Sequence, residues 1–490
     1  MRILFLNLPF KYKISRASRW PEKSKSGTLY YPYWLAYATG VAKQAGFDIS
    51  LIDAIAKNLS FNQTIQEIVA TRPDLLVAEL STPTVSSDLA FFALCRENGF
   101  KGKIVVAGNH ASVFTKELLE KSSDIDFVAF GEYDYTIIDL AKNFISPYKV
   151  PGIAWRENGK IVINQHRAFI CNLDDIPFVS KVYKEYLDFN DYFYSLARHP
   201  MIQVLSSRGC PFNCSFCFTP QTAGGHSFRT RSVDNFVYEL EYISQELPQI
   251  KEVFIEDDTF TVDKKRVQAI CEEIIRKKIK LCWSANVRAD VDYETLKLMK
   301  SAGCRLVVVG YESGNQKILD GVEKKITLKD SIDFANNTKR VDLKVFGCFM
   351  IGLPGETKDT IHETYEFAKK LEPDMVFFQQ AVPFPGTKFY NLAKENGFLV
   401  SENFDKWFNT QGQLTTLVKY ENLSAEYLEK VRDKLMIKYY LSFKYIFNTL
   451  LRNRDINEMY RVLLGGMNYF LYLLGRRIPF FNRRDENERV

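Results

Sequence analysis

Hydrophobic residues in the first third of the chain form short runs that alternate with longer amphipathic stretches. Short apolar runs bounded by turn residues, such as "KIVVAG" (103–108), predict buried strands. Longer stretches between them, such as "WLAYATGVAKQAG" (34–46), predict helices. We therefore expect residues 1–149 to form a Rossmann-like domain with a parallel sheet covered on both faces, which binds ligands beyond the carboxyl ends of its strands. The expected strands are 2–10, 48–54, 74–81, 103–108 and 127–132.

The pattern changes over residues 150–200 and then resumes. "GIAWRENGKIVINQ" (152–165) predicts a hairpin that turns at Asn158-Gly159, and the aromatic-rich stretch after it lacks clean periodicity. We interpret 150–200 as a connector. Strands and helices alternate again over 201–400, which predicts a partial (βα)6 TIM-like barrel or an open doubly wound sheet with its site at the carboxyl ends of the strands. The expected strands are 201–207, 252–258, 281–287, 305–312, 344–352 and 374–383.

Residues 401–490 are rich in aromatic residues and predict a mostly helical C-terminal domain, which we expect to cap the barrel. Within it, the apolar-rich stretch 461–484 is flanked by arginines. It predicts either packing on the barrel or peripheral contact with a membrane surface. No segment offers the roughly 20 apolar residues that a membrane-spanning helix needs.

Composition narrows the class of protein only modestly. The 490 residues are 46% hydrophobic and 25% charged, and a net charge of +6 is too small to predict a nucleic-acid partner. The opening "MRILFLNLPF" reads as a first strand and not as a secretory signal. We therefore expect a cytoplasmic protein, in which clustered cysteines bind metal or do chemistry and do not form disulfides.

Three of the nine cysteines lie close together in the stretch "SSRGCPFNCSFCFTP", residues 206–220, with the spacing C-x3-C-x2-C. These are Cys210, Cys214 and Cys217, and they follow the first strand of the second alternating region. His226 would complete a four-ligand zinc site. Alternatively, three thiolates hold a four-iron cluster and leave one iron open to a ligand that is not protein, with the interleaved phenylalanines shielding it from water. The other cysteines are scattered singly and predict small buried side chains.

This cysteine motif resembles that of the radical SAM superfamily, and further motifs follow it in the order that the family shows. "FIEDDTF" (254–260) resembles the segment where a carboxylate meets the methionyl amine of S-adenosylmethionine (SAM), and "GYESGN" (310–315) resembles the segment near its ribose. "GCFMIGLPGET" (347–357) and "PFPGTKFY" (383–390) resemble the segments after the fifth and sixth strands. The resemblance implies that the cysteines hold a 4Fe-4S cluster. It also implies SAM contacts from Glu256, Asp257, Asp258, Arg288, Gly310, Glu312, Ser313 and Gly352.

Four arginines in this region have two interpretations. They pair with the carboxylate of SAM or with an acidic substrate, or they form ordinary surface ion pairs. The four are Arg208, Arg229, Arg231 and Arg288.

The front domain lacks the G-x-G-x-x-G of dinucleotide-binding folds. Its position ahead of a radical SAM barrel resembles the cobalamin-binding domain of the B12-dependent subfamily. No D-x-H-x-x-G motif is present to supply a histidine below cobalt, and His110 is interpreted as a polar loop residue. The six cations from Lys11 to Lys25 meet either corrin carboxylates or an acidic substrate, or lie in a solvated loop. The resemblance implies cobalamin contacts from Asp53, Ser81, Thr82, Gly108, Asn109, Gly131 and Glu132.

The resemblance implies a B12-dependent radical SAM enzyme. In that family, reductive cleavage of SAM gives a 5′-deoxyadenosyl radical, which abstracts hydrogen from an unactivated carbon, and methylcobalamin then supplies a methyl group. The alternatives are an oxidative cyclase or carbon–carbon bond-forming enzyme, and a cluster- or cobalamin-binding sensor without turnover. The expected partners are a small-molecule, lipid or glycan-intermediate substrate and a flavodoxin or ferredoxin as electron donor.

Overall fold

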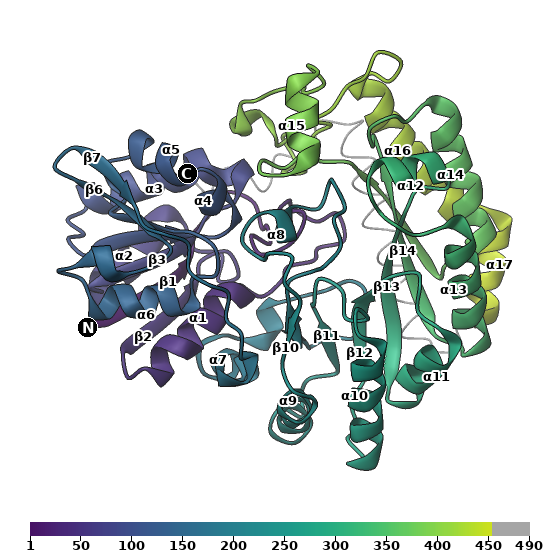
Figure 1. Ribbon diagram of the computed structural model, residues 1–490, viewed down its shortest axis with the longest axis horizontal. Helices are drawn as coiled ribbons and strands as arrows, with labels where there is room; N and C mark the ends of the chain where they lie inside the picture. Colours follow the sequence, from purple (N-terminus) through teal and green to yellow (C-terminus); the bar gives the residue numbers. More distant parts are fainter. Residues whose placement is uncertain (453–490) are drawn as a thin grey trace.

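A computed structural model describes residues 1–452 of the chain (Figure 1). The first sheet has the strand order β2-β1-β3-β4-β5-β6-β7, and β1 to β5 run parallel, as predicted. Its strands are β1 (Arg2–Asn7), β2 (Asp48–Asp53), β3 (Leu75–Glu79), β4 (Lys103–Ala107), β5 (Phe127–Ala129), β6 (Ile153–Glu157) and β7 (Lys160–Ile163). Its helices are α1 (Tyr33–Gln44), α2 (Phe61–Thr71), α3 (Val85–Glu97), α4 (Asn109–Val113), α5 (Thr115–Lys121) and α6 (Asp134–Lys142).

Alternation of side chains along β1 divides the front core into two layers. Ile3 and Phe5 face one apolar cluster, whereas Leu4 and Leu6 face the other. All four are fully buried, because helices cover both faces of the sheet. The predicted hairpin forms as β6 and β7, and it extends this sheet because β6 pairs antiparallel with β5. The connector also contains a short helix, α7 (Val179–Tyr186), which the sequence pattern did not predict.

The second sheet is an open barrel of six parallel strands in the order β15-β14-β13-β12-β11-β8. Its strands are β8 (Met201–Val204), β11 (Glu252–Ile255), β12 (Trp283–Val287), β13 (Cys304–Glu312), β14 (Lys344–Ile351) and β15 (Met375–Gln380). The helices beside it are α9 (Val233–Glu246), α10 (Lys264–Arg276), α11 (Tyr293–Ser301), α12 (Gln316–Gly321), α13 (Leu328–Arg340), α14 (Lys358–Leu371) and α15 (Lys388–Glu395). A separate two-stranded pair, β9 (Ser207–Arg208) with β10 (Arg229–Thr230), brackets the three cysteines and the short helix α8 (Phe218–Gln221).

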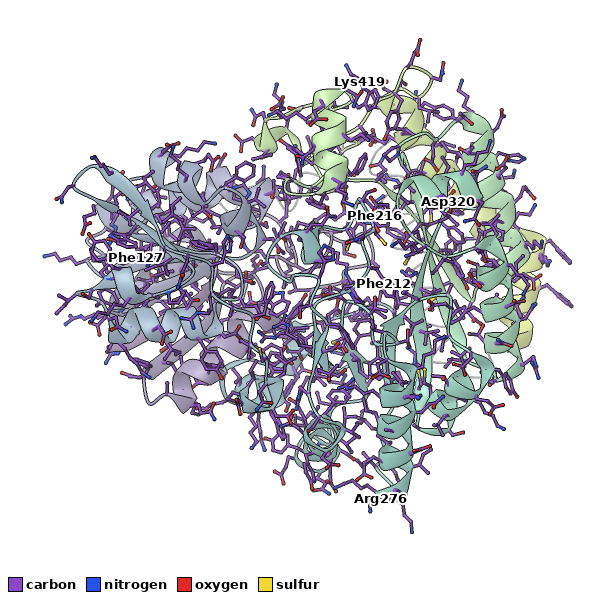
Figure 2. The ribbon with its side chains drawn as sticks, in the orientation of Figure 1. Phe127, Phe212, Phe216, Arg276, Asp320 and Lys419 are labelled. Carbon is purple, nitrogen blue, oxygen red and sulfur yellow. The ribbon has the colours of Figure 1, made fainter. Side chains whose placement is uncertain are left out.

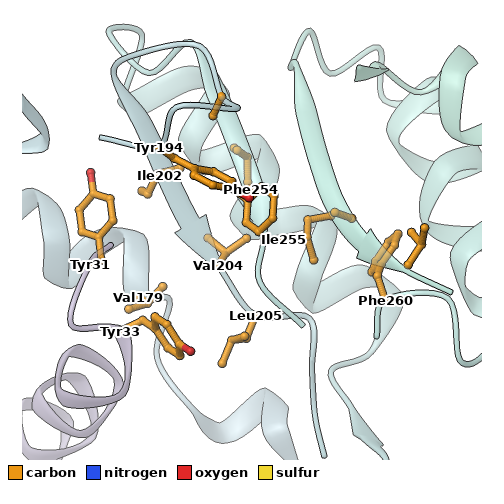
Figure 3. Close-up of a cluster of buried hydrophobic side chains, with 14 of the residues drawn as sticks. Tyr31, Tyr33, Val179, Tyr194, Ile202, Val204, Leu205, Phe254, Ile255 and Phe260 are labelled. Carbon is orange, nitrogen blue, oxygen red and sulfur yellow. The ribbon is translucent and has the colours of Figure 1, made fainter. Parts of the chain in front are cut away.

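Segments from outside the barrel cover its two edge strands. At β8, the Tyr31 hydroxyl donates to the carbonyl of Met201 (2.8 Å), and its backbone N–H donates to the Gln203 side chain (3.0 Å). Tyr31 comes from the front domain and joins the buried cluster that also holds Val204 and Phe254 (Figure 3). The two domains therefore share one continuous core at this edge.

At the other edge, helix α16 (Ala425–Tyr440) lies along β15. The Tyr440 hydroxyl accepts from the Val376 N–H (3.0 Å) and donates to the Val376 carbonyl (2.7 Å). This double contact satisfies backbone groups that an edge strand leaves unpaired. Helix α17 (Phe443–Arg452) ends the described chain, so the predicted stretch 461–484 lies outside the described residues. Within the described part, no helix is long and apolar enough to cross a membrane.

Candidate functional site

The three cysteines lie in one loop between β9 and α8. Cys210 and Cys214 are buried and Cys217 is half-buried. Burial raises the pKa of Cys217, and Asp258 and the other two thiols raise it further, which means that the three sulfurs share one electrostatic environment. The Gln221 side chain donates to the carbonyls of Cys214 (3.1 Å) and Cys217 (2.6 Å) and so fixes the loop. Phe212 and Phe216, which alternate with the cysteines in the sequence, lie between the front domain and the strands β13 and β14 in the view of Figure 2.

The arrangement of these thiols distinguishes between a cluster and zinc. Within residues 1–452, no three His, Cys, Asp or Glu side chains converge as they would on a single metal ion. Thiolates on one zinc lie within about 4 Å of each other, since each Zn–S bond is about 2.3 Å. Thiolates of a four-iron cluster each bind a different iron and stay farther apart. His226 is exposed, and its ring Nδ1 lies 3.2 Å from the Cys210 carbonyl oxygen. Three cysteine thiols from one loop are donors of the kind that hold an iron–sulfur cluster.

Two of the acids after β11 have different surroundings. Asp257 is fully buried and accepts from the N–H groups of Ser206 (2.6 Å) and Ser207 (3.2 Å) and from both of their hydroxyls. It therefore fixes the start of the cysteine loop. Glu256 accepts from the Gln203 side chain (3.0 Å), and burial raises its pKa to about 7 against the opposing charge of Arg19. Glu256 is thus the acid of this pair that retains capacity to bind an ammonium group.

Arg19, which the sequence analysis placed only within a group of cations, reaches this site from the front domain. Its guanidinium donates to the Asp258 carboxylate (3.3 Å) and to the carbonyls of Asp257 and Asp258. Burial lowers the pKa of Arg19, but Asp258 and Glu256 more than offset it, so its pKa is raised and the group stays charged. The only sequence signal for it was a cation-rich segment after the first strand. Of the neighbouring cations, Arg16 pairs with Asp88 (2.8 Å).

The strand ends after β13 and β14 form a second polar group. Glu312 pairs with the buried amine of Lys324 (2.6 Å), a residue that the sequence analysis missed. A Cβ at Gly310 would lie 2.2 Å from the Glu312 carboxylate, so a side chain here would displace that carboxylate. Ser313, by contrast, is buried against the Thr364 hydroxyl (3.1 Å).

Gly352, after β14, donates its N–H to the Glu356 carboxylate (2.6 Å). Burial raises the pKa of Glu356 to about 8. One oxygen of this carboxylate is buried without a hydrogen-bond partner. Glu356 therefore orders the turn after β14. Its Oε1 atom remains without a hydrogen-bond partner and can accept when the carboxylate is ionised or donate when it is protonated.

The four arginines form neither surface pairs nor free carboxylate-binding groups. Arg208 pairs with Asp134, and Arg229 pairs with Glu132 (2.8 Å), so both ends of the cysteine loop are fixed to the front domain. Arg231 pairs with Glu239. Arg288 donates to the carbonyls of Lys324 (2.9 Å) and Lys325 (3.1 Å) and lies 3.6 Å from the Phe212 ring centroid. Arg288 therefore packs against Phe212 and stabilises the cysteine loop.

A pocket lies at the carboxyl ends of the front-sheet strands, as their alternation predicted. Four of the residues proposed for cobalamin line it, namely Ser81, Thr82, Gly108 and Asn109. Glu79, His110, Arg16 and Trp34 are among the other front-domain residues that line it. Phe218, which directly follows Cys217, and Phe384 from the barrel line the opposite side. The cysteine loop and the front sheet therefore share one pocket.

The remaining residues proposed for cobalamin lie outside the lining of this pocket. Asp53 is buried and accepts from Asn7 (2.8 Å) and from the Tyr192 hydroxyl (3.0 Å). Glu132 is engaged with Arg229, and the Gly131 N–H donates to the Ser112 hydroxyl (3.0 Å). These contacts give all three residues a structural role in the front domain.

The six scattered cysteines are free thiols. Cys95, Cys271 and Cys304 are buried, whereas Cys282 and Cys348 are half-buried. Cys171 is exposed and departs from the expected buried class.

Comparison with known proteins matches two regions of the chain to family models. Residues 204–368 match the Radical SAM superfamily, and residues 23–141 match the B12 binding domain. The chain is 31% identical over 455 residues to an uncharacterized methyltransferase of Pyrococcus horikoshii, covering 92% of this chain and 95% of the relative. It is 27% identical to the anaerobic magnesium-protoporphyrin IX monomethyl ester cyclase of Rubrivivax gelatinosus, covering 97% and 85%.

A solved structure has the same fold. The chain resembles TsrM from Kitasatospora setae, a radical S-adenosylmethionine methyltransferase solved with cobalamin and a 4Fe-4S cluster bound. The TM-score is 0.67 at 18% identity, and the match covers 88% of this chain and 81% of that one.

Proposed function

Because the chain belongs to the radical SAM enzymes that carry a cobalamin-binding domain, we propose that it transfers a methyl group to an unactivated carbon of a small-molecule substrate. The methyltransferase relative from Pyrococcus horikoshii supports this reaction, since the match spans nearly the whole of both chains. The structural observation that carries the proposal is the pocket between Glu79 of the front sheet and Phe218 of the cysteine loop. A substrate held beside this pocket would meet both cofactors.

Cys210, Cys214 and Cys217 would hold the 4Fe-4S cluster, and Glu256 would accept a hydrogen bond from the SAM ammonium. When bound, the cluster and SAM supply hydrogen abstraction, and cobalamin supplies the methyl group. Arg19 would favour the ionised form of Glu256, because its charge opposes protonation of that carboxylate. Phe218 packs on Phe384 with ring centroids 4.9 Å apart. This apolar wall would exclude water from the space between the two sites.

The residues around the front pocket fit a corrin cofactor without a protein ligand below cobalt. His110 lines the pocket, but its ring Nδ1 lies 3.1 Å from the Thr82 hydroxyl, and burial lowers its pKa to about 3. Its ring also lies against Phe114, with centroids 4.8 Å apart. We propose that Ser81, Thr82, Gly108 and Asn109 would surround the nucleotide tail of the cofactor.

Anaerobic reconstitution tests the proposal. The protein is supplied with iron, sulfide and hydroxocobalamin, and iron content, EPR spectra and SAM products are measured. We expect iron in the protein and 5′-deoxyadenosine under strong reductant, and a methylated product together with S-adenosylhomocysteine when a substrate is present. Protein that holds no iron and never cleaves SAM would contradict the proposal, and a colourless zinc protein would favour the zinc-site interpretation.

Oxidative cyclisation is the second candidate, because the Rubrivivax gelatinosus cyclase matches 97% of this chain. The two reactions differ in their products. Methyl transfer adds one methylene to the substrate mass and forms S-adenosylhomocysteine, whereas cyclisation removes hydrogens and forms no homocysteine product.

The electron donor and the location of the enzyme are further parts of the proposal. We expect flavodoxin or ferredoxin to reduce the cluster. At the end of the described chain, Leu441 and Phe443 are 71% and 83% exposed, which supports peripheral contact with a lipid surface. Flotation with vesicles, comparing the full chain with a variant that ends at residue 454, would test this contact. Equal flotation of both proteins would exclude a role for the tail.

A further inference from the structure

A buried carboxylate in the wall of the front pocket has incomplete pairing. Glu79, the last residue of β3, is only 6% exposed and lines the pocket. The cation that acts on it, Arg16, is itself paired with Asp88 at 2.8 Å. The Tyr133 hydroxyl also acts on this carboxylate, yet it is buried and has no hydrogen-bond partner in standard geometry. Glu79 in the pocket wall is thus free to accept further hydrogen bonds, and the buried Tyr133 hydroxyl acts on it from outside the pocket lining.

Such an arrangement is costly in the free protein. Burial disfavours the ionised carboxylate and raises the pKa of Glu79 to about 7, although Tyr133 and Arg16 oppose the shift. Buried carboxylates are normally paired, and Glu79 has no cation of its own at a strand end that lines a pocket, so a ligand can supply its partner. The ligand must bring hydrogen-bond donors, because a carboxylate can only accept.

Cobalamin has donors of this kind, since primary amides surround its corrin ring and each carries two N–H groups. We propose that Glu79 anchors the corrin ring by accepting hydrogen bonds from its peripheral amides. This inference rests on the proposed function, since it requires cobalamin in the front pocket. Amide donors stabilise the ionised carboxylate, so cobalamin binds most tightly to the deprotonated protein.

Among the ionisable groups that surround the pocket end of β3, Glu79 is the one that changes its protonation state between pH 6 and 8. Burial holds the pKa of His110 near 3 and raises that of the Tyr133 and Tyr33 hydroxyls, so all three stay neutral. The other facing charges are in ion pairs: Asp88 with Arg16, and Asp134 with Arg208.

Methylcobalamin binding to the full-length protein, measured in dim light by quenching of tryptophan fluorescence, tests the anchor. This probe has no cobalt-bound water to titrate, and Trp34 lines the pocket. Wild-type affinity should be about tenfold higher at pH 8 than at pH 6, as expected for a group with a pKa near 7 that must be ionised. Glu79→Gln should remove this pH dependence and weaken binding at pH 8 by about 10- to 100-fold, as expected for loss of charged hydrogen bonds.

Two further variants make the result specific. Glu97→Gln changes an exposed acid of the same domain and should bind like wild type. Tyr133→Phe removes a hydroxyl that lowers the pKa of Glu79, so the midpoint of the pH dependence should move upward. This second shift remains testable even where Glu79→Gln does not fold.

The outcomes separate the two hypotheses. Wild-type protein that binds no methylcobalamin would overturn the proposed cobalamin function itself. Wild-type binding with an unchanged pH dependence in folded Glu79→Gln, or an unshifted midpoint in Tyr133→Phe, would overturn only the anchor.

Discussion

Arg208 and Asp134 form a two-pronged ion pair between the cysteine loop and the front domain, with N–O distances of 2.8 and 3.0 Å. Their side chains are only 3% and 4% exposed. Arg208 also lies over Trp34 and Tyr37, with its guanidinium carbon 5.0 and 5.2 Å from the ring centroids. Because Arg208 comes two residues before Cys210, this pair fixes the base of the metal-binding loop against the cobalamin-binding domain.

Removing one partner of this pair should destabilise both the fold and the cluster. Asp134→Asn leaves the Arg208 charge buried with a poorer partner, which should cost on the order of 3 kcal/mol. We expect a lower thermal midpoint and faster loss of iron on desalting of the reconstituted protein. The matched control is Glu120→Gln, which removes an exposed ion pair with Lys116 and should cost less than about 0.5 kcal/mol. Equal iron retention in the two variants would contradict a role of the Arg208–Asp134 pair in holding the cysteine loop.

SAM binding should depend on pH through Glu256. Burial raises the pKa of this acid to about 7, so it is partly protonated at neutral pH and ionises as pH rises. A carboxylate that accepts from the SAM ammonium must be ionised, so affinity should increase from pH 6 to pH 8. Equilibrium dialysis of SAM with reconstituted protein measures this increase. Glu256→Gln should bind more weakly and without pH dependence, and a pH-dependent Gln variant would assign the titration to another group.

Arg19 should set the midpoint of that pH dependence. Its charge opposes protonation of Glu256, so Arg19→Gln should move the midpoint of SAM binding upward, whereas Arg19→Lys should preserve most of the effect. Lys23→Gln, an exposed cation of the same segment, is the control and should leave the midpoint in place. A midpoint that does not move in Arg19→Gln would exclude electrostatic control by this residue.

Gly310 should not tolerate a side chain. In Gly310→Ala the Cβ would lie 2.2 Å from the Glu312 carboxylate and 3.0 Å from the Lys324 amine, so the buried pair must shift. We expect a loss of about 1–3 kcal/mol of stability and weaker SAM binding, measured by thermal unfolding and dialysis. Gly321→Ala adds the same methyl group where nothing lies within 4 Å and should be nearly neutral. Equal behaviour of the two variants would show that the Glu312–Lys324 pair is dispensable.

Periodicity predicted the fold well because each strand and helix is coded locally. The alternation of Ile3, Leu4, Phe5 and Leu6 between two buried layers is typical of a strand covered on both faces. The cysteine spacing likewise predicted a metal-binding loop, since three donors within eight residues are themselves a local signal.

Local sequence patterns do not predict contacts between segments that are far apart in the chain. Arg19 lies 239 positions from Asp258 in the sequence, and Arg208 lies 74 positions from Asp134, so no spacing rule joins them. Glu79 was missed for a different reason. In the sequence it is a single acid at the end of an apolar strand, and only the fold reveals that it faces a pocket beside an unpartnered hydroxyl.

The cation-rich segment after β1 also contacts residues 412–414, which lie far from it in the sequence. The Lys23 N–H donates to the Gly412 carbonyl (2.8 Å), and the Leu414 N–H donates to the Glu22 carboxylate (2.8 Å). During synthesis on the ribosome the front domain can fold early, but these contacts must wait until residues beyond 410 have emerged. The segment that carries Arg19 therefore reaches its final position only after most of the chain has been made.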